Sequence, residues 1–335
     1  MNYRTLGKTG LMVSEVGIGG IPIQRSDVNA AKDLLAKAAE LGVNFLDSAR
    51  AYSVSESYLG EALEGIRERF VIATKSGAKT KEDMARDVDI SLHNFRTDYI
   101  DLYQFHNPSA AALEQIMAPG GALEALLEAK ISGKIGHIGV TLHSREMFQQ
   151  VLEYDWVETI MFPYNIVETQ AEELIARCAE HNIGFICMKP MAGGALDDAS
   201  HAMRFLAQNE NISIALPGME TVAELEQNVV AFADKSPLSA CENEKIEAVR
   251  KELGSSFCRR CNYCAPCTAG ISICSVFLFE GYLTRYNLVE WAKSRYEAMD
   301  KTASDCIGCG VCEPRCPYGL PIREMMKKAV KLFDK

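Results

Sequence analysis

Short apolar runs, rich in β-branched and aromatic residues and bounded by turn residues, recur along the first two thirds of the chain. Runs of this length and composition are typical of β-strands. We expect eight strands, at residues 16–19, 44–47, 70–75, 99–106, 137–141, 159–163, 184–188 and 213–216. Residues with a helical period of apolar positions lie between them, at 29–41, 81–94, 123–132, 169–182 and 222–233. The chain therefore alternates strand and helix.

This alternation predicts an α/β fold with a parallel sheet. Eight parallel strands with helical crossovers favour a closed (β/α)8 TIM barrel, and an open doubly wound sheet is the alternative. Residues 3–14 place a Gly-rich turn between two extended pieces, a pattern that predicts an N-terminal β-hairpin. In a barrel, this hairpin would be able to plug the bottom.

The alternation stops after Ala240, and the rest of the chain holds two cysteine runs separated by a helical, aromatic segment at 277–300. A barrel needs roughly 250 residues, and the chain has 335. We therefore expect a barrel domain at 1–240 and a small, mostly helical second domain at 241–335.

Composition and charge exclude several classes of protein. Hydrophobic residues make up 48% and charged residues 24%, which is ordinary for a globular protein with a large core. A formal charge of -10 argues against a nucleic-acid or anionic-membrane partner, because either needs a concentrated basic face. The sequence shows no secretory signal and no apolar stretch near the roughly 20 residues of a membrane span. We expect a cytoplasmic protein.

Four polar residues come at or just after the ends of successive predicted strands: Asp47, Tyr52, Lys75 and His106. Each alone has a structural interpretation, since strand-end ion pairs and satisfied histidines are common. Barrel enzymes, however, place their active sites at the carboxyl ends of the strands, so the joint placement favours a catalytic site. A nearby lysine cation would lower the pKa of the tyrosine, making it a better general acid, and the histidine would orient a carbonyl oxygen.

Residues 1–235 resemble the aldo-keto reductase family, through motifs spread along this part of the chain. The matching segments are Tyr-Arg-Thr-Leu-Gly-Lys-Thr-Gly-Leu at 3–11, Phe-Leu-Asp-Ser-Ala-Arg-Ala-Tyr at 45–52, Leu-Gly-Glu-Ala-Leu at 59–63, Ala-Thr-Lys at 73–75, Asp-Leu-Tyr-Gln-Phe-His at 101–106, Pro-Tyr-Asn at 163–165 and Leu-Pro-Gly at 216–218. The resemblance implies that Asp47, Tyr52, Lys75 and His106 form a catalytic tetrad. It also implies a small-molecule carbonyl or alcohol substrate and NADP or NAD as cofactor, with Tyr52 as the general acid and base.

The implied nicotinamide pocket differs from the family pattern. Where members usually have Ser, Asn and Gln, this chain has Thr141, Leu142 and Met161. Met188 stands where an aromatic residue often stacks on the ring, and a thioether is able to pack against a ring face. The remaining residues that we expect at the cofactor are Gly20, Pro190, Gly194, Gly218, Gln227 and Asn228. Glu224 occupies a position where an arginine often meets the 2'-phosphate, so both NAD and NADP stay open.

The second cysteine run has the C-x2-C-x2-C-x3-C-P spacing of bacterial ferredoxins, and the first run is a divergent version with two residues before its last cysteine. Their eight cysteines are Cys258, Cys261, Cys264, Cys267, Cys306, Cys309, Cys312 and Cys316. Eight thiolates suit two 4Fe-4S clusters in a ferredoxin-like domain. The usual exchange between runs would pair the first three with Cys316 and the last run's first three with Cys267. Zinc is the main alternative for C-x2-C pairs, and Cys274 is either a spare ligand or a buried thiol. We expect the three remaining cysteines, Cys178, Cys187 and Cys241, in the core.

Three functional hypotheses follow. The first is an NAD(P)H-dependent carbonyl or alcohol oxidoreductase with clusters in its second domain. The second is an electron-transfer module that passes electrons between the clusters and the barrel site or a flavoprotein partner, because a hydride carrier moves two electrons and a cluster moves one. The third is a sensor that keeps the barrel as a scaffold, and the intact tetrad argues against it.

Overall fold

The computed structural model describes residues 1–196, 199–254, 256–260 and 262–333. The chain forms two compact units. The first, which we call the barrel unit, comprises Met1–Asn165, Thr169–Met191 and Asp198–Pro237. The second, the cysteine unit, comprises Leu238–Lys335 together with two short segments, Ile166–Glu168 and Ala192–Asp197. Each unit is described by itself.

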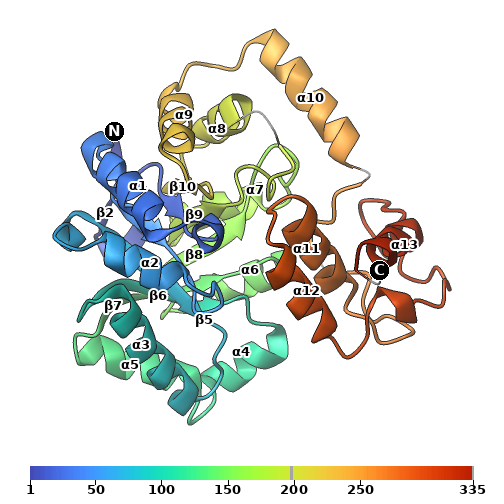
Figure 1. Cartoon of the computed structure of the whole chain (residues 1–335), viewed down its shortest axis with the longest axis horizontal. Helices are drawn as coiled ribbons and strands as arrows, with labels where there is room; N and C mark the ends of the chain where they lie inside the picture. Colours follow the sequence, from blue (N-terminus) through green and yellow to red (C-terminus); the bar gives the residue numbers. More distant parts are fainter. Residues whose placement is uncertain (197–198, 255, 261, 334–335) are drawn as a thin grey trace. The chain divides into compact units, whose positions relative to one another are not determined.

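Eight parallel strands in sequential order form the centre of the barrel unit (Figure 1). They are β3 (Ile18–Gly19), β4 (Phe45–Asp47), β5 (Val71–Ser76), β6 (Ile100–His106), β7 (Ile135–Thr141), β8 (Thr159–Pro163), β9 (Gly184–Met188) and β10 (Ile214–Leu216). Parallel bridges join the two edges of the sheet, at Val16 with Ala215 and at Gly19 with Gly218. The edges therefore meet, which confirms the (β/α)8 barrel over the open sheet.

The predicted N-terminal hairpin is present as β1 (Tyr3–Thr5) and β2 (Met12–Ser14), which pair antiparallel. Its turn approaches the start of β9 so closely that a side chain on Gly7, whose φ is +52°, would collide with the backbone of Gly184. Leu6 and Val13 are fully buried, and they pack with inward side chains of the strands such as Phe45. The hairpin thus closes the barrel interior with apolar side chains.

Helices surround the strands of the barrel unit (Figure 1). They are α1 (Val28–Leu41), α2 (Ser55–Ala62), α3 (Lys81–Phe95), α4 (Ala110–Met117), α5 (Ala122–Ile131), α6 (Arg145–Val151), α7 (Glu172–Glu180), α8 (Ala199–Ala207) and α9 (Val222–Ala233). Side-chain caps fix several starts, because the Asp27 and Thr80 side chains accept hydrogen bonds from the first turns of α1 and α3. The apolar faces of these helices and the outer faces of the strands share one core.

The cysteine unit contains α10 (Ala240–Gly254), α11 (Ile273–Thr284), α12 (Val289–Glu297) and α13 (Ile322–Phe333). The predicted helical segment between the cysteine runs is the pair α11 and α12. A second apolar core, separate from that of the barrel, includes Val276, Phe277 and Met326. Tyr296 stacks on Phe333 with ring centroids 4.0 Å apart, and its hydroxyl accepts a hydrogen bond from the Ala303 N–H.

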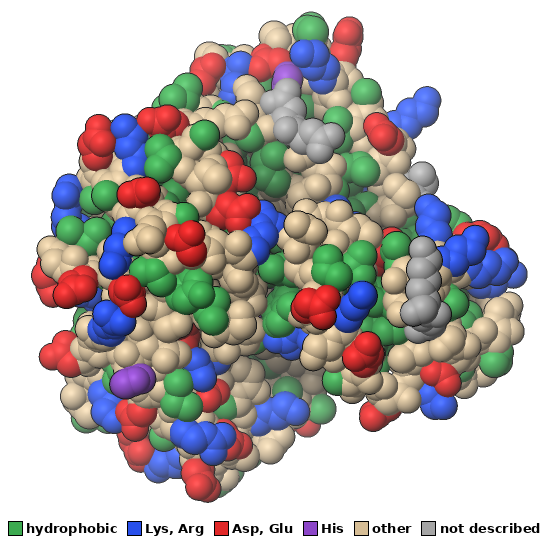
Figure 2. Space-filling view, viewed as in Figure 1, with side chains coloured by type: hydrophobic (Ala, Val, Ile, Leu, Met, Phe, Trp, Pro, Cys, Tyr) green, Lys and Arg blue, Asp and Glu red, His purple; other side chains and the backbone are tan. Residues whose placement is uncertain are grey.

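Two surface features complete the fold. On the visible face of the barrel unit in Figure 2, acidic and basic side chains lie intermixed over the helices. None of the helices in the described part of the chain is long and apolar enough to cross a membrane.

Of three cysteines that sequence reasoning places in the core, Cys178 and Cys187 are buried, but Cys241 is exposed. The expectation for Cys241 is wrong because it lies in the first turn of α10, a helix with little buried surface.

Candidate functional site

A buried ion pair joins the ends of β4 and β5. The Lys75 ammonium donates to the Asp47 carboxylate, and only 2% of Lys75 and 3% of Asp47 are exposed. Lys75 Nζ also donates to the Ser48 carbonyl at 2.7 Å. Burial raises the pKa of the Asp47 carboxyl, while Lys75 and the Gln104 amide, which donates to Asp47 at 3.1 Å, offset part of that rise. The lysine charge is thus held in place.

Tyr52 and His106 lie beside this pair. Lys75 Nζ is 4.9 Å from the centre of the Tyr52 ring. The rings of Tyr52 and His106 meet edge to face with centroids 6.0 Å apart, and both residues are half-buried. The structure therefore brings all four predicted residues to the carboxyl ends of β4, β5 and β6, with the lysine cation next to the tyrosine.

Glu56, which sequence reasoning missed, accepts a hydrogen bond from Arg50 in the loop that carries Tyr52. Its carboxylate is 1% exposed and accepts hydrogen bonds from the hydroxyls of Thr74 and Ser91 and from Arg50 at 2.5 Å. The Arg50 N–H in turn donates to the Lys75 carbonyl at 2.9 Å. The Asn94 amide is the fourth donor to this buried carboxylate. The four hydrogen bonds fix the position of Glu56, and through Arg50 they restrain the loop between β4 and α2 that carries Tyr52. Glu56 lies at the start of α2, and nothing in its spacing from Tyr52 or Lys75 indicates this network.

Gly20 and Gly218, both expected at the cofactor, allow close backbone approach. A Cβ on Gly20 would lie 2.7 Å from the Asp47 carbonyl and 2.8 Å from Ser55 Oγ. Gly218 bridges to Gly19, and a Cβ there would lie 2.9 Å from Pro22. Gly20 therefore permits the strand end that carries Asp47 to stay in register with β3.

The residues expected along the nicotinamide lie on β7, β8 and β9. Thr141 pairs in register with His106, is buried, and its hydroxyl accepts a hydrogen bond from the Asn107 N–H. Met161 belongs to the apolar cluster inside the barrel, and Met188 packs against the same cluster. Sequence reasoning missed Asn165 as a site residue. Its buried amide donates to the Lys189 carbonyl at 3.0 Å and so links the loops after β8 and β9.

The two further residues expected after β9 fall in different units. Pro190 is buried in the barrel unit. Gly194 belongs to the cysteine unit, with a φ of +76°, and a Cβ on it would touch Arg285. A predicted cofactor residue is therefore packed among residues of the cysteine-bearing part of the chain.

At the start of α9, Glu224 caps its own helix. Its carboxylate accepts from the N–H groups of Glu220 and Thr221 at 2.9 and 3.0 Å and from the Thr221 hydroxyl. One turn later, Gln227 is exposed and Asn228 is 5% exposed. Within the described ranges, Asn228 Oδ1 is buried and has no hydrogen-bond donor. The helix start already holds a carboxylate, and one turn later the described residues offer the Asn228 amide oxygen no donor.

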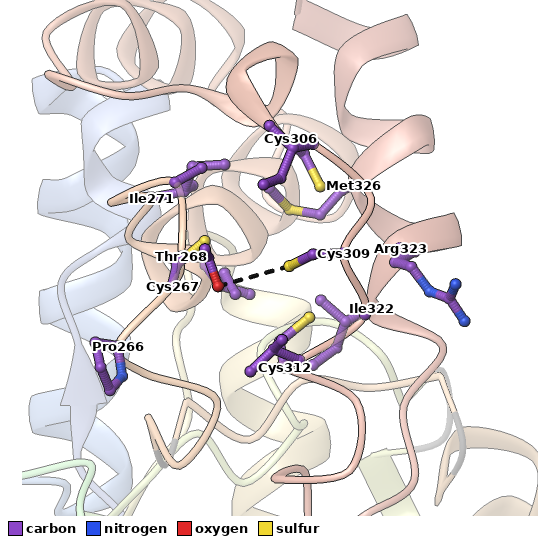
Figure 3. Close-up of a pocket in the computed structure, with 15 residues that line it drawn as sticks. Pro266, Cys267, Thr268, Ile271, Cys306, Cys309, Cys312, Ile322, Arg323 and Met326 are labelled. Carbon is purple, nitrogen blue, oxygen red and sulfur yellow. Dashed lines mark hydrogen bonds between the residues drawn. The ribbon is translucent and has the colours of Figure 1, made fainter.

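In the cysteine unit, Cys306, Cys309, Cys312 and Cys267 line one pocket (Figure 3). The four side chains come from both cysteine runs, and Ile271, Ile322 and Met326 supply the apolar wall. The Cys309 thiol donates to the Thr268 hydroxyl at 3.6 Å. This is the grouping that the exchange of the fourth cysteine between runs requires.

A second pocket is lined by Cys258, Cys264 and Cys316, together with Cys274. Cys274 Sγ lies 3.9 Å from Cys264 Sγ, so the extra cysteine sits among the expected ligands. Cys261, the remaining expected ligand, lies outside the described residues. Among the residues that are described, no three Cys, His, Asp or Glu side chains converge on one metal-ion position, and the thiols instead line the two pockets.

Comparisons with known proteins agree with this architecture. A model of the aldo/keto reductase family matches residues 15–202, and a model of a 4Fe-4S dicluster domain matches residues 257–321. L-galactose dehydrogenase of Arabidopsis thaliana is 26% identical over 302 residues, which cover 74% of this chain and 94% of that protein. The uncharacterized oxidoreductase YqkF of Bacillus subtilis is 28% identical over 289 residues, covering 78% of this chain and 92% of its own.

A solved structure is similar over the same region. The aldo-keto reductase AKR11C1 from Bacillus halodurans, in its holo form, superposes with a TM-score of 0.64 and 26% identity, covering 74% of this chain and 96% of its own. The family model spans more than half of the 335 residues. The chain therefore belongs to the aldo/keto reductase family of oxidoreductases, and a 4Fe-4S dicluster domain follows its barrel.

Proposed function

We propose that this chain is an NADH-preferring oxidoreductase that reduces a small-molecule carbonyl compound, or oxidises the corresponding alcohol, at the Asp47, Tyr52, Lys75 and His106 site. The observation that carries this proposal is the buried Lys75–Asp47 pair with its ammonium 4.9 Å from the Tyr52 ring. We assign the reaction to a barrel domain at 1–240 and two 4Fe-4S clusters to a domain at 241–335.

Each residue has a distinct part in the chemistry. A nicotinamide, when bound, supplies or accepts the hydride. The Tyr52 hydroxyl donates a proton to the carbonyl oxygen and takes it back in the reverse direction. Lys75 stabilises the phenolate left behind, because an adjacent cation favours the charged form. Asp47 keeps Lys75 in place, and His106 orients the carbonyl oxygen by hydrogen bonding.

The start of α9 supports a preference for NADH. Asn228 Oδ1, buried and without a donor in the described ranges, is a fitting acceptor for a donor group of the nucleotide. Glu224, in contrast, occupies the N–H groups that would otherwise receive a phosphate. A 2'-phosphate brought to this turn would face a carboxylate, so the extra phosphate of NADPH is disfavoured.

A second candidate function is electron exchange with a protein partner. In the cysteine unit, Cys309 is exposed, and the neighbouring Ile307 and Val311 are 68% and 40% exposed. Exposed apolar side chains beside a redox centre are suited to brief contact with a one-electron carrier. This role is compatible with hydride transfer in the barrel, since the two involve different groups.

Replacement of Tyr52 tests the main proposal. Tyr52→Phe removes the proton donor but keeps the ring, so kcat for carbonyl reduction should fall roughly 100- to 10,000-fold. The rate is measured as NADH oxidation with a panel of aldehydes and ketones under anaerobic conditions. Tyr58→Phe, on the neighbouring helix α2, is the control and should retain activity. Full activity in Tyr52→Phe would contradict the assigned mechanism.

Replacement of Glu224 tests the cofactor preference. Glu224→Gln keeps a cap acceptor but removes the negative charge, so the ratio of the NADPH to the NADH dissociation constant should fall by about tenfold. Both constants are measured by isothermal titration calorimetry. Glu226→Gln, on the exposed side of the same helix and paired with Lys37, is the control. An unchanged ratio in Glu224→Gln would show that the phosphate does not meet this turn.

Iron content tests the assignment of the thiols. Cys316→Ser should lose one of two clusters, about half of the iron and acid-labile sulfide. Cys274→Ser should retain the full amount, because eight other cysteines supply the ligands. If Cys274→Ser lost a cluster while Cys316→Ser kept its full iron content, Cys274 would be the cluster ligand and Cys316 would not.

Replacement of Ile307 tests electron exchange at the exposed residues Ile307, Cys309 and Val311. Ile307→Glu places a charge beside Cys309, and it should slow the one-electron reaction with reduced flavodoxin, followed by stopped-flow absorbance. The matched control is Ile131→Glu, because Ile131 is 87% exposed on α5 of the barrel unit. Equal rates in both variants and the parent protein would argue against this edge as the docking site.

A further inference from the structure

The cysteine unit includes two short loops that do not belong to the C-terminal part of the sequence. Residues 166–168 begin three positions after β8, and residues 192–196 begin four positions after β9. Both loops therefore continue from strands whose carboxyl ends form the rim of the barrel. Arg250, Arg259, Arg260 and Arg285 contact one or the other of these loops.

Arginines hold the backbone of both loops. Arg250 Nε donates to the Ile166 carbonyl at 2.8 Å, and Arg259 Nε donates to the Val167 carbonyl at 3.4 Å. Arg285 Nε donates to the Gly193 carbonyl at 3.1 Å. A guanidinium presents several donors in a rigid plane, so each contact restrains the direction of a loop as well as its distance.

A fourth arginine makes a buried ion pair with the first loop. Arg260 Nη2 lies 2.7 Å from Glu168 Oε1, and the Glu168 side chain is fully buried, with 9% of the Arg260 side chain exposed. A buried carboxylate without a cation is strongly unfavourable, so the position of Glu168 depends on that of Arg260. We call Arg250, Arg259, Arg260 and Arg285 the arginine clamp.

The clamp is tied to the first cysteine run by covalent and noncovalent contacts. Arg259 and Arg260 directly follow Cys258, and Arg260 Nη1 donates to the Cys258 carbonyl at 3.2 Å. Phe257, which precedes it, is 4% exposed, and the guanidinium groups of Arg260 and Arg285 lie 5.4 and 5.6 Å from its ring. A shift of the Cys258 backbone is therefore transmitted to Arg259 and Arg260, which hold the first loop, and to the Arg285 guanidinium beside Phe257, which holds the second.

We propose that cluster binding by the first cysteine run sets the position of the loops after β8 and β9 through the arginine clamp, and that tight nicotinamide binding in the barrel requires this loaded state. The inference rests on the proposed function for its second half, because Gly194, an expected cofactor residue, lies in the second of these loops. The first half concerns this chain's own loops and stands independently. The clamp residues are positioning residues, which act on the cofactor through the loops.

The test compares the full-length protein with its clusters, the same protein stripped of iron by a chelator, and the variant Arg260→Met. Hydrogen–deuterium exchange is measured on peptides that cover residues 164–169 and 191–196, and NADH affinity is measured by calorimetry. In the iron-free protein, exchange in both peptides should rise and the NADH dissociation constant should increase by at least about fivefold. Arg260→Met should show the same two changes while its iron content stays that of the parent.

Two further variants keep the outcome interpretable. Glu168→Gln removes the same ion pair by changing its acidic partner, which lies far from the cysteines in the sequence. If Arg260→Met loses iron, the conclusion therefore rests on Glu168→Gln. Lys327→Met removes an exposed cation that pairs with Glu324 on α13, and it should change neither exchange nor affinity. Unchanged exchange in both peptides of the iron-free protein and of Glu168→Gln would overturn the clamp. Failure of the loaded parent protein to bind NADH would overturn the proposed function, while the exchange data would still decide on the clamp.

Discussion

The buried ion pair between Lys75 and Asp47 is the interaction on which the barrel site depends. Two charges that are nearly inaccessible to water persist only if each satisfies the other, and the Ser48 carbonyl and the Gln104 amide complete their hydrogen bonding. Removal of either partner would leave an uncompensated buried charge, at a cost of about 3–5 kcal/mol. The register of β4 with β5 places these residues, and Gly20 lets β3 approach the end of β4 that carries Asp47. The position of the cation next to Tyr52 is therefore a property of the barrel as a whole.

Much of the barrel follows from local sequence. Each strand is a short apolar run, and the expected and observed strands coincide within two residues at either end. Three of the four polar residues at the rim are identifiable because Asp47, Lys75 and His106 stand where an apolar run, and with it a parallel strand, ends. Tyr52 follows in the loop after the first of these strands. Gln104 and Glu56 escaped prediction because their roles depend on hydrogen bonds across strands and helices, which no local pattern encodes. Asn165 lay within a quoted motif, but its bond to the Lys189 carbonyl depends on the path of a second loop.

In the cysteine unit, too, local spacing is predictable from the sequence and long-range packing is not. Spacing within each run predicts which cysteines act together, since the second run has the ferredoxin pattern. The distribution of thiols between two pockets needs the fold of α11 and α13, which brings residues from both runs together. Nothing in the sequence indicates that the loops after β8 and β9 pack with this unit, because the contacts join residues about ninety positions apart, such as Glu168 and Arg260. Contacts between polar groups that are distant in the sequence could not be predicted, because no local pattern encodes them.

We propose that a hydride passes directly from a nicotinamide to a carbonyl carbon beside Tyr52, separate from the one-electron chemistry of the clusters. The most direct measurement uses NADH with deuterium at C4 and mass spectrometry of the alcohol produced, under anaerobic conditions. Direct transfer predicts one deuterium at the carbinol carbon for one face of the labelled nicotinamide and none for the other. Product free of deuterium with both labelled cofactors, formed at an unchanged rate, would contradict direct hydride transfer, because the hydrogen would then come from solvent.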